Sequence, residues 1–282
     1  MNRLVVGEHS RITRLTSGRS DGCSVGVEAH LYDRLRHFDR HGRSQADAVF
    51  DWRDGYARTT QWVGVVQVPG LQVEILPKTD TGTTEFDSQD QCDARTNLLY
   101  MLAVGGDVPV RSRDVARLAT RKAPLSETLA AIFAERLRQE LLLGLERGYL
   151  HRQENLRCFK GKLLISEQAQ ANAAHRERFY CRFDEFSDDI GMNRIFKAAC
   201  RVLLGATCSP ATQDGLRQCL LLLDGVSDQE ISDSDFASIA INRQNQRFED
   251  VLGFCRLVLA GRSPTIQAGS TRSFSLVFDM NK

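Results

Sequence analysis

A nucleophile pattern occurs near the N-terminus, where Gly22-Cys23-Ser24-Val25-Gly26 matches the G-x-S-x-G motif of serine hydrolases. In that motif the serine lies on a sharp turn between an apolar strand and a helix. The preceding residues 15–21 (LTSGRSD) are mostly polar and predict a loop where the strand should be. A chance match at the edge of a strand is the better interpretation, and a hydrolase acting through Ser24 is the least supported alternative.

A second pattern could bind a metal ion, because Asp33, His37 and His41 recur at intervals of four residues. On a helix this spacing would place three ligands on one face. The surrounding sequence is charged and Gly42 follows at once, so we favour a solvated surface turn. The eight cysteines include no C-x-x-C pair and have no histidine at zinc-finger spacing. We therefore predict no metal site.

Two acidic pairs, Asp184-Glu185 and Asp188-Asp189, could supply a general acid and base or bind a cation. They lie between a predicted strand and a predicted helix, where a turn and a helix N-terminus accommodate carboxylates. We therefore interpret them as structural. The residues expected to hold this turn are Asp189, Asn193, Arg194 and Lys197.

The most basic stretch lies between His151 and Arg182, where seven basic and three acidic side chains leave a net charge of +4 in a chain whose total is +1. The basic residues are Arg152, Arg157, Lys160, Lys162, Arg176, Arg178 and Arg182. From the residues alone, a solvated hairpin and a binding surface are equally good interpretations. Because the total charge is near zero, any nucleic-acid contact would have to come from such local patches.

The elements that would carry this charge are two strands and a helix. Apolar residues predict strands over 155–165 and 179–186, the second with clear alternation. Between them, residues 166–178 (SEQAQANAAHRER) are polar and predict a loop longer than an ordinary hairpin turn. After the acidic turn, apolar residues at helical spacing from Met192 to Leu203 predict a helix.

Residues 1–78 are rich in strand signals. The clearest is a hairpin in which Pro69-Gly70 joins the apolar runs 62–68 and 71–76. Residues 79–93 are polar and predict a linker, and helical patterns dominate from 94 to 282. We therefore expect an α+β chain with a β-rich N-terminal domain, a linker, and a helical core that carries a basic β-hairpin finger at about 152–186.

The order of these elements resembles the McrC family, the nuclease subunits of McrBC-type, modification-dependent restriction systems. The similarity comprises a Gly-Lys strand, a strand that ends in an aromatic-Asp-Glu turn, and Asp189-x-x-x-Asn193-Arg194-x-x-Lys197 at the start of a helix. Upstream, Asn97 to Leu102 is similar to the family's Asn-x-x-Tyr-Met-Leu segment, and Phe278 to Lys282 resembles the start of a helix that leads into its nuclease domain. The resemblance extends from about Arg95 to the C-terminus.

The resemblance implies a partner, a ring-shaped AAA+ GTPase of the McrB type, whose channel receives the finger and whose GTP hydrolysis is stimulated. The residues expected to contact the partner are Arg157, Lys160, Lys162, His175, Arg176 and Arg178. GTP would be bound by the partner and DNA by the assembled complex, in defence against phage and other foreign DNA. No small-molecule substrate is implied.

Nuclease chemistry of the family's type needs an Asp/Glu-x-Lys motif and Mg²⁺. The residues two positions before the six lysines are Leu76, Thr120, Cys158, Lys160, Ile195 and Met280, so we expect neither the motif nor the nuclease domain in this chain. Gly161-Lys162 also lacks the glycine that a Walker A loop has five residues earlier, so no cofactor is expected here.

No signal peptide and no apolar run of membrane-spanning length is visible, which predicts a cytoplasmic protein. One alternative function remains open, a stand-alone DNA-binding module in which the β-domain and the basic hairpin together grip a duplex. Such binding would weaken steeply with salt, because each phosphate contact releases counterions.

Overall fold

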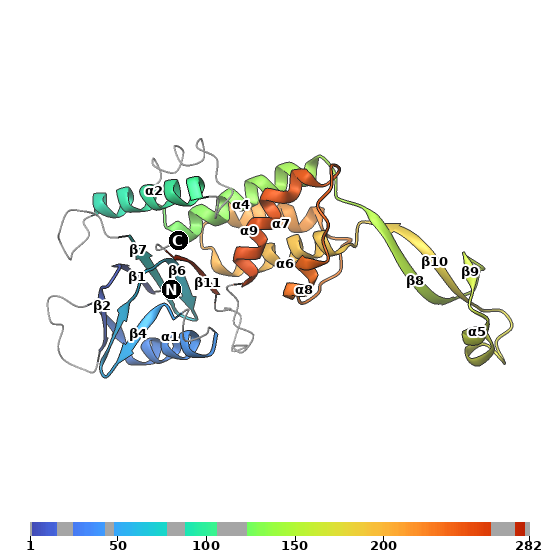
Figure 1. Ribbon diagram of the computed structural model, residues 1–282, viewed down its shortest axis with the longest axis horizontal. Helices are drawn as coiled ribbons and strands as arrows, with labels where there is room; N and C mark the ends of the chain where they lie inside the picture. Colours follow the sequence, from blue (N-terminus) through green and yellow to red (C-terminus); the bar gives the residue numbers. More distant parts are fainter. Residues whose placement is uncertain are drawn as a thin grey trace.

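A computed structural model describes residues 2–15, 25–42, 48–77, 88–105, 123–260 and 274–279. Within these residues the chain is a mixed α/β protein with eight α-helices and three small sheets. Figure 1 shows a β-rich N-terminal half, a helical half beside it, and a long β-structure that extends away from the helices. The predicted mixture of helices and strands, with a β-rich N-terminus, is confirmed.

In its described ranges, the N-terminal half contains two four-stranded sheets and one helix. The first sheet has the order β1 (Asn2–Gly7), β7 (Leu71–Leu76), β6 (Trp62–Val68) and β11 (Phe274–Asp279). The second has the order β3 (Val25–Glu28), β2 (Arg11–Leu15), β5 (Tyr56–Thr59) and β4 (Phe50–Arg53). Helix α1 (Ala29–Gly42) follows β3 directly and contributes Leu31, Leu35 and Phe38 to the core between the sheets.

The predicted hairpin is present, because β6 and β7 pair antiparallel across the turn at Pro69-Gly70. Every residue of β7 is buried, including Glu74, whose side chain is 1% exposed. This carboxylate pairs with Arg3 at 2.5 Å and Arg95 at 2.7 Å and accepts the backbone N–H of Leu125 at 3.1 Å. Burial alone would raise the pKa of Glu74, but the two guanidiniums outweigh it and lower the pKa. Glu74 thereby connects the sheet to two helices of the other half.

Strand β11 corrects one expectation from the resemblance. Phe278 and Asp279 were expected to begin a helix, but they end a strand that pairs antiparallel with β6 from Phe274↔Gln67 to Asp279↔Trp62. Alternation explains the strand, since Leu276 and Phe278 are buried in the core against the helices. At Gly64 a Cβ would lie 2.0 Å from the Leu276 oxygen, so the close approach of β6 and β11 requires glycine. Residues 280–282 lie outside the described residues.

Helix α1 corrects a second expectation. Asp33, His37 and His41 were interpreted as part of a surface turn, but they lie in this helix of 14 residues. Its three apolar side chains recur at helical spacing, a pattern that the many charges between them obscure. Asp33 pairs with Arg14 at 2.7 Å. Among the described residues, no group of three or more His, Cys, Asp or Glu side chains could hold a metal ion.

The helical half packs around one core that also includes Val63 and Val65 of β6. Its helices are α2 (Ser88–Gly105), α4 (Leu125–Leu142), α6 (Gly191–Ala206), α7 (Pro210–Leu222), α8 (Asp233–Ala237), the 3-10 helix η2 (Gln246–Phe248) and α9 (Glu249–Ala260). Of the predicted linker 79–93, residues 88–93 lie in α2 and 79–87 lie outside the described residues. No helix in the described ranges is long and apolar enough to cross a membrane.

Candidate partner-binding arm

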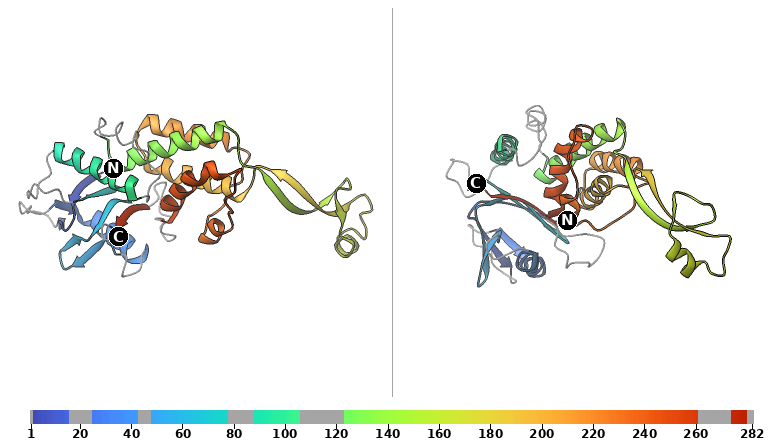
Figure 2. Two further views of the ribbon diagram at one scale, coloured as in Figure 1. Left: turned by 45° about the horizontal axis from the view of Figure 1, so that its top comes forward. Right: turned by 45° about the vertical axis from the view of Figure 1, so that its right-hand side comes forward.

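The basic stretch forms a structure that we call the arm, residues 148–187. Strands β8 (Gly148–Leu156) and β10 (Phe179–Ser187) pair antiparallel along their full length, from Ser187↔Gly148 to Phe179↔Leu156. Beyond Leu156 the chain forms the short strand β9 (Lys162–Leu163), which pairs with Arg182 and Cys181, and then helix α5 (Ile165–Ala171). The arm stands away from the helical half in all three views (Figures 1 and 2).

Strand β10 lies close to the range predicted for it, but the other two elements differ. The prediction of one strand over 155–165 is wrong, because β8 ends at Leu156 and the chain pairs again only at Lys162–Leu163. The loop predicted over 166–178 contains most of α5, whose sequence consists largely of Ala, Glu and Gln, which favour helix. Apolar periodicity could not reveal α5, because none of its residues is buried.

The tip of the arm, residues 156–180, packs against the neighbouring part of β10. Leu164, Cys181 and Phe183 are buried, and the Leu164 N–H donates to the Tyr180 oxygen at 2.8 Å. Gly161 has φ +69°, and a Cβ there would lie 2.4 Å from the Arg182 oxygen. Only glycine fits this close approach without moving β10.

Three amide side chains lock the helix of the tip to the strands. Asn155 and Asn172 exchange hydrogen bonds of 2.8 and 3.0 Å between their amide groups. Gln168 accepts the Tyr180 N–H at 2.6 Å and donates to the Arg178 oxygen at 2.8 Å. Asn172 also donates to Gln168 at 2.9 Å. No pattern in the sequence marked these residues, although the spacing of four between Gln168 and Asn172 is one that brings side chains together on a helix.

The six predicted partner contacts all lie in the tip. Five are exposed and Arg178 is half-buried: the exposed ones are Arg157, Lys160, Lys162, His175 and Arg176. In the part of the chain that the structure describes, no carboxylate lies within ion-pair distance of any of their guanidinium or ammonium groups. His175 approaches Glu177 at 3.2 Å, and the Lys160 ammonium lies 4.0 Å from the centre of the Phe183 ring.

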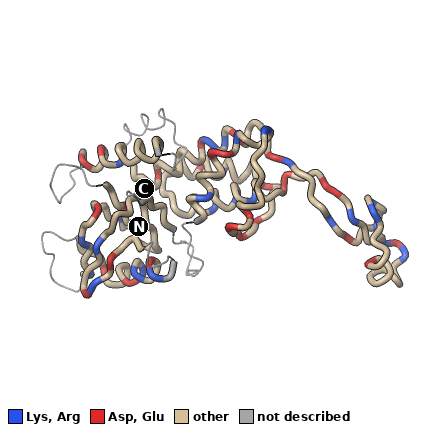
Figure 3. The backbone as a smooth tube through the Cα atoms, in the orientation of Figure 1, with Lys and Arg blue, Asp and Glu red and all other residues tan. Residues whose placement is uncertain are grey.

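The shaft of the arm, between the tip and the helices, differs from the tip in charge. Arg152 lies 2.5 Å from Glu185 and 3.4 Å from Glu154, and His151 pairs with Asp184. Figure 3 shows basic positions gathered at the far end of the arm and acidic positions nearer the helices. Within the described residues, the basic side chains of the arm that have no ion pair therefore lie at the tip and, in the case of Arg182, on the strand opposite Lys162.

Asn193 lies where the arm meets the helical half. This residue of α6 is fully buried, and its side-chain N–H₂ donates to the Glu146 oxygen at 2.8 Å and to the Asp188 oxygen at 2.7 Å. Glu146 precedes β8 and Asp188 follows β10. One amide group therefore binds the chain at the root of both strands.

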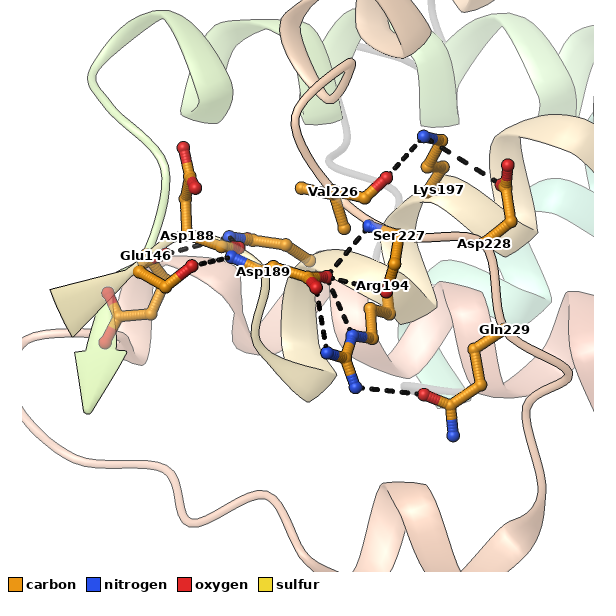
Figure 4. Close-up of polar contacts among 11 residues, drawn as sticks. Glu146, Asp188, Asp189, Arg194, Lys197, Val226, Ser227, Asp228 and Gln229 are labelled. Atoms are coloured by element: carbon orange, nitrogen blue, oxygen red, sulfur yellow. Dashed lines mark hydrogen bonds and ion pairs between the residues drawn. The ribbon is translucent and has the colours of Figure 1, made fainter. Parts of the chain in front are cut away.

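Asp189 and Arg194 form a second contact at the root (Figure 4). The guanidinium binds both carboxylate oxygens, at 2.8 and 3.0 Å, and also donates to Gln229 at 3.0 Å. The same carboxylate accepts the N–H and the hydroxyl of Ser227, each at 2.8 Å. The Arg194 hydrogen bonds and those from Ser227 outweigh partial burial and hold the pKa of Asp189 well below its usual range.

Lys197, the last residue of the predicted turn set, lies one helical turn further along α6. It is buried, donates to the Val226 oxygen at 2.5 Å and lies 3.9 Å from Asp228. Arg194 binds Asp189 directly, Asn193 binds the carbonyl of Asp188, and Lys197 binds the carbonyl of Val226, which precedes Ser227. The four predicted turn residues therefore lie together at the root, and a purely structural role for them stays a prediction. Ser227 was missed, because it is 38 residues from Asp189 and no local pattern links them.

The other residues proposed for chemistry are not brought together. Ser24 lies outside the described residues. Asp184 faces His151 on the shaft, whereas Asp189 faces Arg194 at the root. The two acidic pairs thus serve different contacts, and no shared carboxylate site forms among them.

Solved structures share this fold. A chain of the half-complex from a tetradecameric assembly of Thermococcus gammatolerans McrB AAA+ hexamers with bound McrC matches with a TM-score of 0.69 and 20% identity, over 99% of this chain and 67% of that one. A chain of the Thermococcus gammatolerans McrBC complex, solved by cryo-EM, matches with a TM-score of 0.67 and 20% identity, over 99% and 84% of the two chains.

No curated protein matches the sequence. A protein family does match, the one described as McrBC 5-methylcytosine restriction system component, and it covers residues 57–282. That range includes the hairpin β6–β7, the arm, its root at α6 and strand β11. The chain therefore belongs to the McrBC 5-methylcytosine restriction system component family.

Proposed function

We propose that this chain is the McrC-type subunit that inserts its arm into a ring-shaped AAA+ GTPase of the McrB type and stimulates GTP hydrolysis there. The observation that carries the proposal is the tip, where five cationic side chains have no carboxylate partner among the described residues and lie on an arm that stands away from the helical half. The two Thermococcus gammatolerans assemblies of the same fold, one of which contains McrB AAA+ hexamers with bound McrC, support the choice of partner.

The dimensions and stiffness of the arm suit insertion into a channel. Nine paired residues per strand give a shaft of about 30 Å. The amide contacts of Asn155, Gln168 and Asn172 order the tip before it meets a partner. Because an ordered tip loses little conformational entropy on binding, more of the contact energy remains as affinity.

The charge of the tip suggests how it would act. Arg157, Lys160, Lys162 and Arg176 are exposed and can pair with carboxylates that line a channel. Such contacts would reorder the partner's catalytic residues, since an arginine supplied in trans can raise phosphoryl-transfer rates by orders of magnitude. In this scheme GTP is bound by the partner, DNA is reached through the assembled restriction complex, and this chain needs neither a cofactor nor a small-molecule substrate.

The test measures GTP turnover by the McrB-type protein with and without this chain. Charge reversal at the tip, Arg176→Glu with Arg178→Glu, should abolish most of the stimulation and weaken binding, because losing a paired interfacial charge costs about 2–5 kcal/mol. The matched control reverses two exposed arginines of the helical half, Arg217→Glu with Arg243→Glu, and should leave stimulation unchanged.

Unchanged binding and unchanged turnover with the tip variant would refute the proposal. Equal losses with the control variant would also refute it, because they would show that total charge, and not the tip, determines the interaction. Thermal unfolding of both variants should match that of the unmodified chain, since the altered side chains are exposed or half-buried.

A further inference from the structure

The sheet β3-β2-β5-β4 has one buried and one solvent-facing side. Ile12, Ala57 and Phe50 lie in the core, so their neighbours along each strand point outward. The pairing register places Arg11 opposite Arg58, and Tyr56 opposite Arg53. Three arginines and a tyrosine therefore share the outer face of this sheet.

The pairing of Arg11 with Arg58 is unusual, because like charges directly opposite on neighbouring strands destabilise a sheet. Neither guanidinium has an ion-pair partner within the described ranges. Asp51 lies opposite Arg58 but binds Arg53 at 3.0 Å. Because that carboxylate is bound to Arg53, the Arg11 and Arg58 guanidiniums form no ion pair within the described ranges and are available to an external anion.

The side chains around this pair hold the two arginines in place. Arg58 donates from Nε to the His9 oxygen at 3.1 Å, which fixes its stem and leaves its two terminal nitrogens to other acceptors. Arg11 lies 5.1 Å from the centre of the Tyr56 ring. Guanidiniums held in this way match the geometry of a phosphate group.

We propose that the outer face of this sheet binds the phosphate backbone of DNA, with Arg11 and Arg58 on one phosphate and Arg53 beside them. The family concerns restriction of modified DNA, which selects a nucleic acid over other sources of phosphate. The site lies on the N-terminal half and involves no residue of the arm, so it does not depend on the proposed GTPase partner. Backbone contacts carry no sequence information, so the face adds affinity without specificity.

Salt dependence gives a quantitative test, because each phosphate contact to a duplex contributes about 0.9 to the slope of log K against log salt. Because Arg11 and Arg58 are assigned to one phosphate, the double variant Arg11→Gln with Arg58→Gln should lower that slope by about 0.9. The ratio of the unmodified chain's affinity for a short unmodified duplex to the variant's affinity should therefore be roughly threefold larger at about 50 mM salt than at about 200 mM. Fluorescence anisotropy of the 282-residue chain with labelled duplex measures both quantities.

The matched control removes the same charge elsewhere, Arg217→Gln with Arg243→Gln, and should keep the slope. The variant Arg11→Lys with Arg58→Lys should also keep it, since the charge remains. Absence of duplex binding at low salt, an unchanged slope in the glutamine variant, or equal loss in the control overturns the proposal. Competition by an acidic polypeptide as strong as competition by DNA also overturns it, and would assign the face to a protein partner.

Discussion

At the scale of single residues, the buried amide of Asn193 donates to the Glu146 carbonyl, just before β8, and to the Asp188 carbonyl, just after β10. The sequence places this residue at the start of a helix and adjacent to a turn, and the family resemblance marks it as a site of interest. It could not show that the two acceptors lie 47 and 5 residues away. Contacts of that separation depend on the fold as a whole.

Replacing Asn193 should therefore loosen the arm at its root. Asn193→Ala removes both hydrogen bonds and leaves two carbonyls without this donor, which should reduce the free energy of unfolding by about 2 kcal/mol. Urea titration followed by circular dichroism measures the change. The control Gln229→Ala, which removes an exposed contact to Arg194, should change stability by only a few tenths of a kcal/mol.

The contribution of Asp189 to the free energy of unfolding should depend on pH. Arg194 and Ser227 lower its pKa in the folded protein, so its ionised form stabilises the fold above the unfolded pKa of about 3.9 and that contribution is lost as pH falls below this value. At neutral pH, Asp189→Asn should reduce the free energy of unfolding by about 1.5–3 kcal/mol.

The difference between the two proteins should stay nearly constant from neutral pH to about 5 and shrink as pH falls below about 4, because Asp189 then takes up a proton in the unfolded chain while it stays ionised in the folded one. Denaturant titrations at a series of pH values give this difference directly. A difference that stays constant across the series would contradict the assigned role. Asp214→Asn, which breaks an exposed pair with Arg217, should have little effect at any pH.

At the scale of elements, sequence patterns succeeded where strands or helices alternate cleanly between buried and exposed positions. Strand β10 follows from such alternation, whereas the β6–β7 hairpin, which is buried almost throughout, follows from two apolar runs and the Pro69-Gly70 turn between them. Helix α5 lacks any buried residue, and helix α1 carries many charges between its apolar positions, so neither was recognised. Strand β11 pairs with β6 more than 200 residues earlier, beyond any local signal.

A substitution at Gly161 tests whether the close packing of β9 against β10 orders the tip of the arm. Gly161→Ala should force β9 away from β10, because the new Cβ would collide with the Arg182 oxygen. Hydrogen exchange at the Leu164 amide, which donates to Tyr180, should accelerate, while the stability of the helical half stays the same. GTPase stimulation should fall in parallel if the tip acts as proposed.

Gly205 gives a matched control for this substitution. It lies near the end of α6, and a Cβ there would meet no atom within 4 Å. Gly205→Ala should therefore be neutral or stabilise the protein by up to about 1 kcal/mol. Equal exchange rates at Leu164 in the Gly161 variant and the unmodified chain would contradict the close packing described for the tip.

At the scale of the whole molecule, the two halves share a sheet and a core. Strand β11 enters the N-terminal sheet after the helices have been completed, and the core of the helical half includes Val63 and Val65 of β6. Glu74 adds a buried ionic connection between the sheet and α2 through Arg95. These contacts predict that the halves unfold together.

Two spectroscopic probes distinguish unfolding of the two halves together from independent unfolding of each half. Both tryptophans, Trp52 and Trp62, lie in the N-terminal strands, whereas ellipticity at the helix minimum reports mainly on the other half. The two signals should change at the same denaturant concentration, as expected for one cooperative transition. Transitions with separate midpoints would show that β11 and Glu74 couple the halves only weakly.

The order β1-β7-β6-β11 makes the first and last described strands the two borders of one sheet, at the end of the molecule opposite the arm (Figure 1). A support or dye attached beside either strand would therefore leave the same surface free. Whether the protein is immobilised beside β1 or beside β11, it should capture the ring of the McrB-type GTPase equally well. If the ring were captured in only one of those orientations, blocking of the arm by the support could not be the reason.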